Sequence, residues 1–118
     1  MPAAMVLSLT AGVGACSKST PVPLSPEAER GLVILRSKAC HICHSVDGTP
    51  RMGPTLKGLF GTPRNMADGT SVVADEQYIR RSITDPGSQT VIGATTAMPK
   101  VDLTDEQLAD LVAYISSL

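Results

Sequence analysis

The sequence predicts a small all-α domain, and three observations support this prediction. Helix signals mark three segments: one begins at Pro26, one spans 75–84, and one follows Thr104. Residues 45–74 are rich in Gly and predict loops with at most one helical turn, and the apolar pair Val72–Val73 within them is too short to carry a sheet. At 118 residues, the chain has room for one folded domain.

Composition narrows the possible functions. Hydrophobic residues make up 42% of the chain but aromatic residues only 3%, and there is no Trp. A chain this short with so few rings fills a core poorly from its own side chains, so we expect another component to supply bulk. The formal net charge of −1 indicates no nucleic-acid partner. No apolar run approaches the roughly 20 residues of a transmembrane helix.

The N-terminal residues are typical of a targeting segment rather than of a fold. Residues 3–15 carry no charge and end in small side chains, as in a signal-peptide apolar region, although no Lys or Arg precedes them. The sequence Val13-Gly14-Ala15-Cys16 resembles a bacterial lipoprotein cleavage box, which predicts a signal peptide at 1–15 and a lipidated Cys16. The alternatives are an ordinary cleaved signal and a partly buried free thiol.

Cleavage before Cys16 would leave a tether and one domain. Residues 16–25 include Pro21 and Pro23 among Ser, Thr and Lys, a composition that favours an extended linker. We therefore place the domain at 26–118. A lipid on Cys16 predicts a location in the periplasm or on the outer face of the bacterial cytoplasmic membrane, anchored to a membrane.

The first helix has a clear start. Ser25 can cap it, Pro26 suits its first position, and two Glu follow where the helix dipole favours acids. Its apolar positions are Leu32, Ile34, Leu35 and Ala39. Gly31 in the interior of this helix lowers the stability of the helix by up to about 1 kcal/mol relative to Ala. We expect that this Gly lets another backbone come close. The alternative is that Gly31 only destabilises the helix locally and has no role in packing.

The other two helices are marked by caps and by a proline. Thr104 and Gln107 form a capping box ahead of the C-terminal helix, and Leu103 with Leu108 predicts a hydrophobic staple. An apolar stripe at helical spacing follows: Leu108, Leu111, Val112, Ile115 and Leu118. The middle helix, Asp75 to Thr84, stops before the next Pro, because the residue that precedes a Pro avoids helical geometry.

The pattern that carries chemistry is Cys40-His41-Ile42-Cys43-His44. Cys-x-x-Cys-His is the attachment pattern of c-type haem, in which two thiols add to two vinyl groups of one porphyrin and the His turns its imidazole under the iron. A thioredoxin-like motif would need a βαβ context, and a zinc site would need four ligands, of which only His41 could join the other three. The sequence therefore predicts one covalently attached haem c, held by Cys40 and Cys43, which also supplies the missing bulk of the core.

A second axial ligand would decide what the iron can do. His41 is too close in sequence to His44 to reach the other face of a porphyrin. The Met residues outside the predicted signal are Met52, Met66 and Met98. Met98 precedes Pro99 between the middle and last helices, so a stiffened loop could bring it to the far face. Ordinary core packing suits the other two Met residues better.

Further stretches accompany the haem motif. They are Ala39-Cys-His-Ile-Cys-His-Ser45 with Asp47-Gly48, Met52-Gly-Pro-Thr-Leu-Lys-Gly-Leu-Phe-Gly61, Asp68-Gly69, residues 74–86 and Met98-Pro99. Across residues 26–118 the chain resembles class I c-type cytochromes, and it is especially similar to the cytochrome c domain fused to subunit II of bacterial caa3-type oxidases. The resemblance implies a cytochrome c-like fold with N- and C-terminal helices crossed around the haem. The crossing falls on Gly31 and Leu35 against Leu111 and Tyr114.

The resemblance also implies roles for residues around the haem. The carbonyl of Pro54 would accept a hydrogen bond from the proximal imidazole. Arg64 would pair with a haem propionate, and the ring of Tyr78 would reach one. His44 and Met98 would be the two axial ligands of the iron.

The chain departs from the family pattern at several positions. Leu35 replaces a Phe of the first helix, Gly93-Ala94 replaces a Gly-Tyr pair ahead of the axial Met, and Val73 replaces the Thr that caps the middle helix. No copper-binding domain precedes the haem domain in this sequence, so we expect a free-standing relative.

The expected function is one-electron transfer rather than catalysis, because a His/Met pair leaves no open coordination position on the iron. The expected partners are redox proteins, an oxidase or a quinol-oxidising complex, and nothing in the sequence points to a homo-oligomer. If Met98 is not a ligand, the alternative is a gas sensor or a peroxidase-like enzyme. Scattered basic residues could line a docking face, although ordinary solvated charges are favoured: Lys57, Arg80, Arg81 and Lys100.

Overall fold

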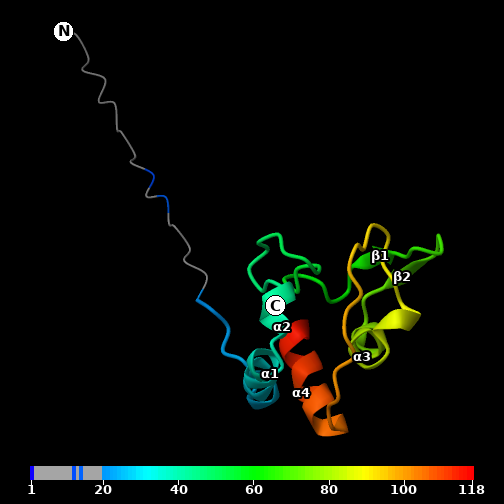
Figure 1. Cartoon of the computed structure of the whole chain (residues 1–118). Coiled ribbons are helices and arrows are strands. Elements are labelled where there is room, and N and C mark those ends of the chain that lie inside the picture. Colours follow the sequence, from blue (N-terminus) through cyan, green and yellow to red (C-terminus); the bar gives the residue numbers. More distant parts are fainter. Residues whose placement is uncertain (2–11, 13, 15–19) are drawn as a thin grey trace.

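The computed structural model describes residues 1, 12, 14 and 20–118. Its elements are α1 (Pro26–Ser37), α2 (Cys40–Cys43), β1 (Pro63–Asn65), β2 (Ser71–Val73), α3 (Glu76–Thr84), the 3-10 helix η1 (Pro86–Ser88) and α4 (Asp105–Ser116). Figure 1 shows α1 and α4 side by side, with α3 packed on α4 and the two strands beyond α3. The predicted all-α fold is confirmed, with one small hairpin added.

The predicted signal peptide and Cys16 lie almost entirely outside the described residues. Within the described part of the chain, no helix is both long enough and apolar enough to span a bilayer. Of the predicted tether, residues 20–23 are exposed, whereas Leu24 is half-buried and packs on the hydrophobic core. The contact of Leu24 therefore extends the packed unit slightly ahead of residue 26.

Helix α1 begins as predicted but ends earlier. The Ser25 hydroxyl accepts a hydrogen bond from the backbone N–H of Ala28 at 3.2 Å, and Pro26 occupies the first turn. The helix ends at Ser37, and Ala39 is exposed with φ at +59°. Ala39 therefore does not belong to the apolar face of α1, and the sequence prediction that placed it there is wrong. The buried residues of that face are Ala28, Gly31 and Leu35.

Gly31 lies where α1 crosses α4, as the sequence predicts. A Cβ at this position would overlap the carbonyl oxygen of Asp110 and lie 2.7 Å from the Cβ of Tyr114. Leu35 and Leu111 are 2% and 1% exposed at the same crossing. Because only a hydrogen fits between the two backbones, Gly31 sets the distance between the helices.

An ion pair closes the crossing at its edge. Arg30 Nε and Nη2 donate to the two carboxylate oxygens of Asp110 at 2.7 and 2.8 Å. Asp110 is 5% exposed, and the hydrogen bonds from Arg30 hold the pKa of its carboxyl below the usual value. This bidentate geometry satisfies a carboxylate that would be costly to bury alone.

Helices α3 and α4 are capped from their own sequences. Asp75 accepts a hydrogen bond from the backbone N–H of Tyr78 at 2.8 Å, so Asp75 takes the capping role left open by Val73. Thr104 and Gln107 form the predicted capping box. The apolar stripe of α4 is buried as predicted at Leu108, Leu111, Val112 and Ile115, and Leu118 is half-buried just beyond the helix.

Val72 and Val73 do belong to a sheet, which corrects the sequence prediction. Strands β1 and β2 are antiparallel with three residue pairs, Pro63 to Val73 through Asn65 to Ser71. The connecting turn supports them, because the Asp68 carboxylate accepts hydrogen bonds from both the N–H and the hydroxyl of Thr70. A ladder this short leaves no alternating pattern in the sequence. Residues 45–74 contain turns and this hairpin but no helix.

Candidate haem site

A cavity of about 680 Å³ opens between the segment that carries the Cys-x-x-Cys-His motif and the segment that carries Met98. Such a volume is typical of cofactor sites, which range over about 300–1,000 Å³. The lining comes from residues 43–64, from α3, from residues 86–99 and from Ile115 of α4. In Figure 1 the first of these segments (teal to green) and the last loop (yellow to orange) run on opposite sides of the domain.

The two motif cysteines lie on one short helical turn. Ala39 adopts a left-handed backbone conformation, with φ at +59°, and α2 begins at the next residue. Cys40 and Cys43 are half-buried with free thiols, and burial raises the pKa of the Cys40 thiol. A non-Gly residue in this conformation is strained by about 1–2 kcal/mol, and such strain gathers at functional sites. Here it lets the chain leave α1 and turn directly into the motif.

His44 is held in one orientation by the loop that follows it. Its Nδ1 lies 2.7 Å from the carbonyl oxygen of Pro54, which can only accept a hydrogen bond. Nδ1 therefore carries the proton, and the lone pair of Nε2 is free to bind a metal ion. The Pro54 contact is the one implied by the family resemblance.

Gly53 makes room for the His44 ring. A Cβ on Gly53 would lie 2.5 Å from Cε1 and 2.8 Å from Nδ1 of the imidazole. The backbone N–H of Gly53 donates to the carbonyl of Cys43 at 2.8 Å, and that of Leu56 donates to Ser45 at 2.8 Å. These bonds join residues 53–56 to the residues on either side of His44, so the loop is held next to the imidazole. Sequence reasoning did not single out Gly53, although a Gly beside Pro54 is a signal of close backbone approach.

The three candidate Met residues occupy different environments. Met98 is half-buried and lines the cavity, whereas Met66 is 6% exposed, pairs in a β-bridge with Val91 and does not line the cavity. Met66 is thus a core residue, as predicted. Met52 is 66% exposed at the cavity mouth, next to Gly53, so core packing is the wrong interpretation for it. Of the three Met residues, Met52 and Met98 line the cavity together with His44, and Met98 is the one that is half-buried there.

The loop that carries Met98 is held by hydrogen bonds where it begins, at residues 89–92. Backbone hydrogen bonds join Ala67 to Thr90 and Ile92 to Asn65, at 2.8 and 2.9 Å. The side-chain amide of Gln89 donates to the Tyr78 carbonyl and to the Ser82 hydroxyl, both at 3.1 Å. No sequence signal marked Gln89, because a single Gln outside a motif has no local pattern.

Arg64 and Tyr78 both line the cavity. Tyr78 is buried, and the Nε of Arg64 is a buried nitrogen with no hydrogen-bond partner in the described part of the chain. An unsatisfied guanidinium N–H in a cofactor-sized cavity fits a ligand with an acidic group, because an unpaired buried donor is costly. Haem carries two carboxylates, so the residues present fit this group.

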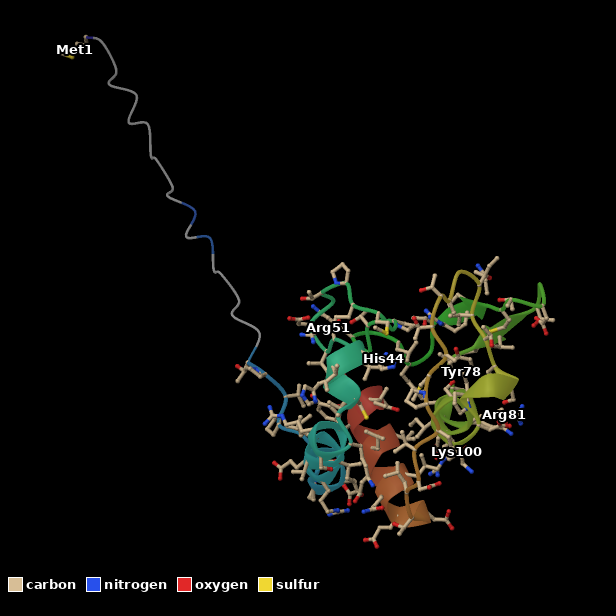
Figure 2. All side chains as sticks on the ribbon, in the orientation of Figure 1. Met1, His44, Arg51, Tyr78, Arg81 and Lys100 are labelled. Atoms are coloured by element: carbon tan, nitrogen blue, oxygen red, sulfur yellow. The ribbon has the colours of Figure 1, made fainter. Side chains whose placement is uncertain are left out.

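The basic residues considered as a docking face do not border the cavity. Lys57, Arg80, Arg81 and Lys100 are not among its lining residues, and Arg80 pairs with Glu76 at 2.9 Å. In Figure 2 the labelled His44 lies between Arg51 on one side and Arg81 and Lys100 on the other. Within the described part of the chain, no three His, Cys, Asp or Glu side chains gather as metal ligands.

Comparison with known proteins identifies the family. The family model for cytochrome c matches residues 28–118, which is most of the chain. No curated protein matches the chain in sequence. The match covers α1 from Ala28 to the end of α4 and includes the whole haem motif. The chain therefore belongs to the cytochrome c family: it is a class I c-type cytochrome with covalently attached haem c and a role in electron transfer.

Proposed function

We propose that this cytochrome is a single-electron carrier whose haem iron is bound by His44 and Met98. The observation that carries the proposal is the cavity itself, lined by His44, with Nε2 free, and by one half-buried thioether. Haem c supplies the Fe(III)/Fe(II) couple. The Cys40 and Cys43 thiols hold the group covalently, as the family membership implies.

The other residues around the cavity would hold the haem in place and set its reduction potential. Pro54 and Gly53 hold the imidazole of His44 in place. The Met98 thioether is a soft ligand that favours Fe(II) and raises the potential. Arg64 would receive a carboxylate on its unpaired Nε, with Tyr78 beside it. The buried walls from α3 and α4 exclude water, which disfavours the extra charge of the ferric state.

The experiment that tests the ligand pair is the substitution Met98→Ala in the holoprotein. Covalent haem is expected to remain after acidic organic extraction, while the weak methionine–iron charge-transfer band disappears, the reduction potential falls and the ferric protein binds added imidazole. Met66→Ala is the matched control, because Met66 is buried outside the cavity. The same spectral change in Met52→Ala or Met66→Ala, or its absence in Met98→Ala, would contradict the assignment. An open ferric site in the unmodified protein would instead favour the gas sensor or peroxidase.

We further propose that the carrier works outside the cytoplasm, anchored by a lipid on Cys16, between membrane-associated respiratory partners. The support is the lipoprotein-like box that ends at Cys16, the extended exposed residues 20–23, and the sequence similarity to the haem domain of caa3-type oxidase subunit II. An oxidase or a quinol-oxidising complex is the expected partner. A diacylglyceryl group carries two chains, which suffice for stable anchoring at about 0.8 kcal/mol per buried methylene.

Intact mass and membrane fractionation of the native protein test the anchor. A mature chain that begins at Cys16 and carries added lipid mass in the membrane fraction is expected. Recovery as an unmodified soluble polypeptide after gentle lysis would overturn the anchor and leave the electron carrier intact.

A further inference from the structure

A second cavity, of about 330 Å³, lies against the haem motif on the side of α1 and α4. Among the described residues, His44 is the one that lines both this cavity and the haem cavity. The Lys, Arg, Asp and Glu residues that line the second cavity are Arg36, Asp47 and Arg51. Charged side chains therefore border the segment that carries His44 from outside the haem cavity.

Arg51 is bound to the motif turn itself. Its Nη1 donates a hydrogen bond to the backbone carbonyl of His41 at 2.8 Å. That carbonyl belongs to α2, whose single turn carries both cysteines of the motif. Two residues after Arg51, the backbone N–H of Gly53 donates to the carbonyl of Cys43 at 2.8 Å. Residues 51 and 53 therefore fasten the same turn, the first through a charged side chain and the second through the backbone.

The positive charge of Arg51 has no direct ion-pair partner in the described part of the chain. Asp47 shares its cavity, and its carboxylate accepts a hydrogen bond from the backbone N–H of Thr49 at 2.9 Å. The pKa of Asp47 is held below its usual value, first by the hydrogen bonds from Thr49 and also by the charge of Arg51. Figure 2 shows Arg51 on the side of His44 that faces away from Tyr78.

We propose that Arg51 is a positioning residue that also raises the reduction potential: its hydrogen bond to His41 holds the haem-bearing turn in place and keeps a positive charge beside His44. The inference rests on the proposed electron-carrier function and names a residue that adjusts the potential of that site. A nearby cation opposes oxidation, because the ferric state carries one more positive charge than the ferrous state. The hydrogen bond matters because it keeps the guanidinium at one distance from the iron, whereas an untethered surface charge moves freely in solvent.

Arg36 is the natural comparison for Arg51. It lines the same cavity and is exposed. The Arg side chains that donate hydrogen bonds in the described part of the chain are those of Arg30, Arg51 and Arg80, so Arg36 is not tied in this way. The two residues thus carry the same charge at one cavity, with and without a fixed position.

The first experiment compares three variants of the holoprotein by the ratio of ferrous to ferric protein at one fixed ambient potential. Arg51→Gln removes the charge and is expected to lower this ratio about threefold at about 10 mM ionic strength, with a smaller loss in high salt. Arg51→Lys keeps a charged donor, and its ratio should stay within about 1.5-fold of the unmodified value. Arg36→Gln is the matched control, and its change should also stay within about 1.5-fold.

Asp47→Asn supplies a change of opposite sign. Its amide oxygen can still accept the hydrogen bond from Thr49, while the negative charge is lost. The ferrous to ferric ratio is therefore expected to rise, by about twofold at low ionic strength. This variant leaves the bond between Arg51 and His41 in place, so it tests the effect of charge at this cavity even if Arg51→Gln yields no holoprotein.

The positioning role has a readout that does not depend on the iron. Amide hydrogen exchange of Gly53 reports opening of the bond to the Cys43 carbonyl. In the ferrous holoprotein, Arg51→Gln is expected to speed this exchange about fivefold, because the turn has lost one of its two ties to the loop. Arg51→Lys and Arg36→Gln should exchange at the unmodified rate.

Each part of the proposal can be overturned separately. Equal ferrous to ferric ratios in Arg51→Gln and the unmodified protein, or a lower ratio in Asp47→Asn, would overturn the role of charge. Equal losses in Arg51→Gln and Arg36→Gln, or unchanged exchange of Gly53 in Arg51→Gln, would overturn the positioning role. Failure of the proposed axial ligands looks different, since the unmodified holoprotein would then lack the methionine–iron band whatever the variants at Arg51 do.

Discussion

At the crossing of α1 and α4, two backbones touch through Gly31, and a buried carboxylate is paired with Arg30 across the interface. On the far side of the cavity, residues 95–100 make no hydrogen bond with any residue that the structure describes. Beyond them, Val101 forms only a long bond of 3.4 Å to the carbonyl of Ile83. The crossing is held in place by close packing. The loop at 95–100 is held by hydrogen bonds of the residues before and after it and, in the proposed function, by the bond from Met98 to the haem iron.

The difference teaches where stability and redox properties are controlled. Substitutions at the crossing should lower the free energy of unfolding and leave the iron environment unchanged, because the crossing residues Gly31, Leu35 and Leu111 do not line the cavity. The one residue of α4 that does line it is Ile115. Substitutions beside the cavity should alter the iron environment with a smaller effect on global unfolding. The following substitutions test this division.

The largest effect is expected from Gly31→Ala. The new methyl group would overlap the Asp110 carbonyl, so the helices must separate, at a cost of about 3 kcal/mol that outweighs the better helix propensity of Ala. Denaturant unfolding of the holoprotein measures this loss. Val33→Ala, at an exposed position on the same helix, should stay within about 0.5 kcal/mol. Unchanged stability of Gly31→Ala would mean that the crossing is not close.

A smaller global effect and a clear change at the iron are expected from Gly53→Ala. The Cβ would displace the imidazole and break the His44–Pro54 hydrogen bond, which contributes about 1 kcal/mol. The absorption spectrum and reduction potential of the holoprotein should both shift. Gly87→Ala is the control, because Gly87 also lines the cavity but a Cβ there meets nothing within 4 Å. If both variants keep the native spectrum, the imidazole is not held by this contact.

Gln89→Ala tests how the Met98 loop is fastened. Removal of two hydrogen bonds to α3 is expected to cost about 1 kcal/mol, felt as local opening rather than global unfolding. Imidazole should then bind the ferric holoprotein about fivefold faster. Ser88→Ala removes only an exposed bond to the Asp85 carbonyl and should leave this rate unchanged. Equal rates in the two variants would show that the loop is fastened elsewhere.

The smallest effect concerns pH and the crossing. The hydrogen bonds from Arg30 lower the pKa of Asp110 in the folded state, so this pair stabilises the fold above the unfolded pKa of about 3.9 and loses its contribution as pH falls through the folded value. Asp110→Asn should therefore lower Tm at pH 7. In strong acid the Tm values of the variant and the unmodified protein should come closer together, because Asp110 is then protonated. Asp102→Asn, at an exposed position outside the helices, is the control. A Tm difference that does not shrink as the pH falls below the unfolded pKa of about 3.9 would contradict this account.

Local features were predictable from the sequence because their causes lie within a few residues. The capping box at Thr104, the start of α1 at Ser25 and the close approach at Gly31 each follow from residue chemistry at fixed short spacing. The hairpin at 63–73 was missed because three residue pairs give no periodic signal. The end of α1 was misjudged because Ala39 is a good helix former that the following motif forces into a left-handed turn.

The sequence by itself determined the covalent haem, because two thiols and a His within five residues need only one turn of chain to meet one porphyrin. Only the tertiary structure decided that Met98 is the half-buried Met of the cavity wall, that the Nε of Arg64 is buried there without a partner among the described residues, and that Arg30 meets Asp110 across 80 residues. It also decided that, within the described part of the chain, Arg64 is the one Lys, Arg, Asp or Glu that lines the cavity. These features depend on how distant segments pack together, and no spacing along the chain encodes which side chains then share one surface.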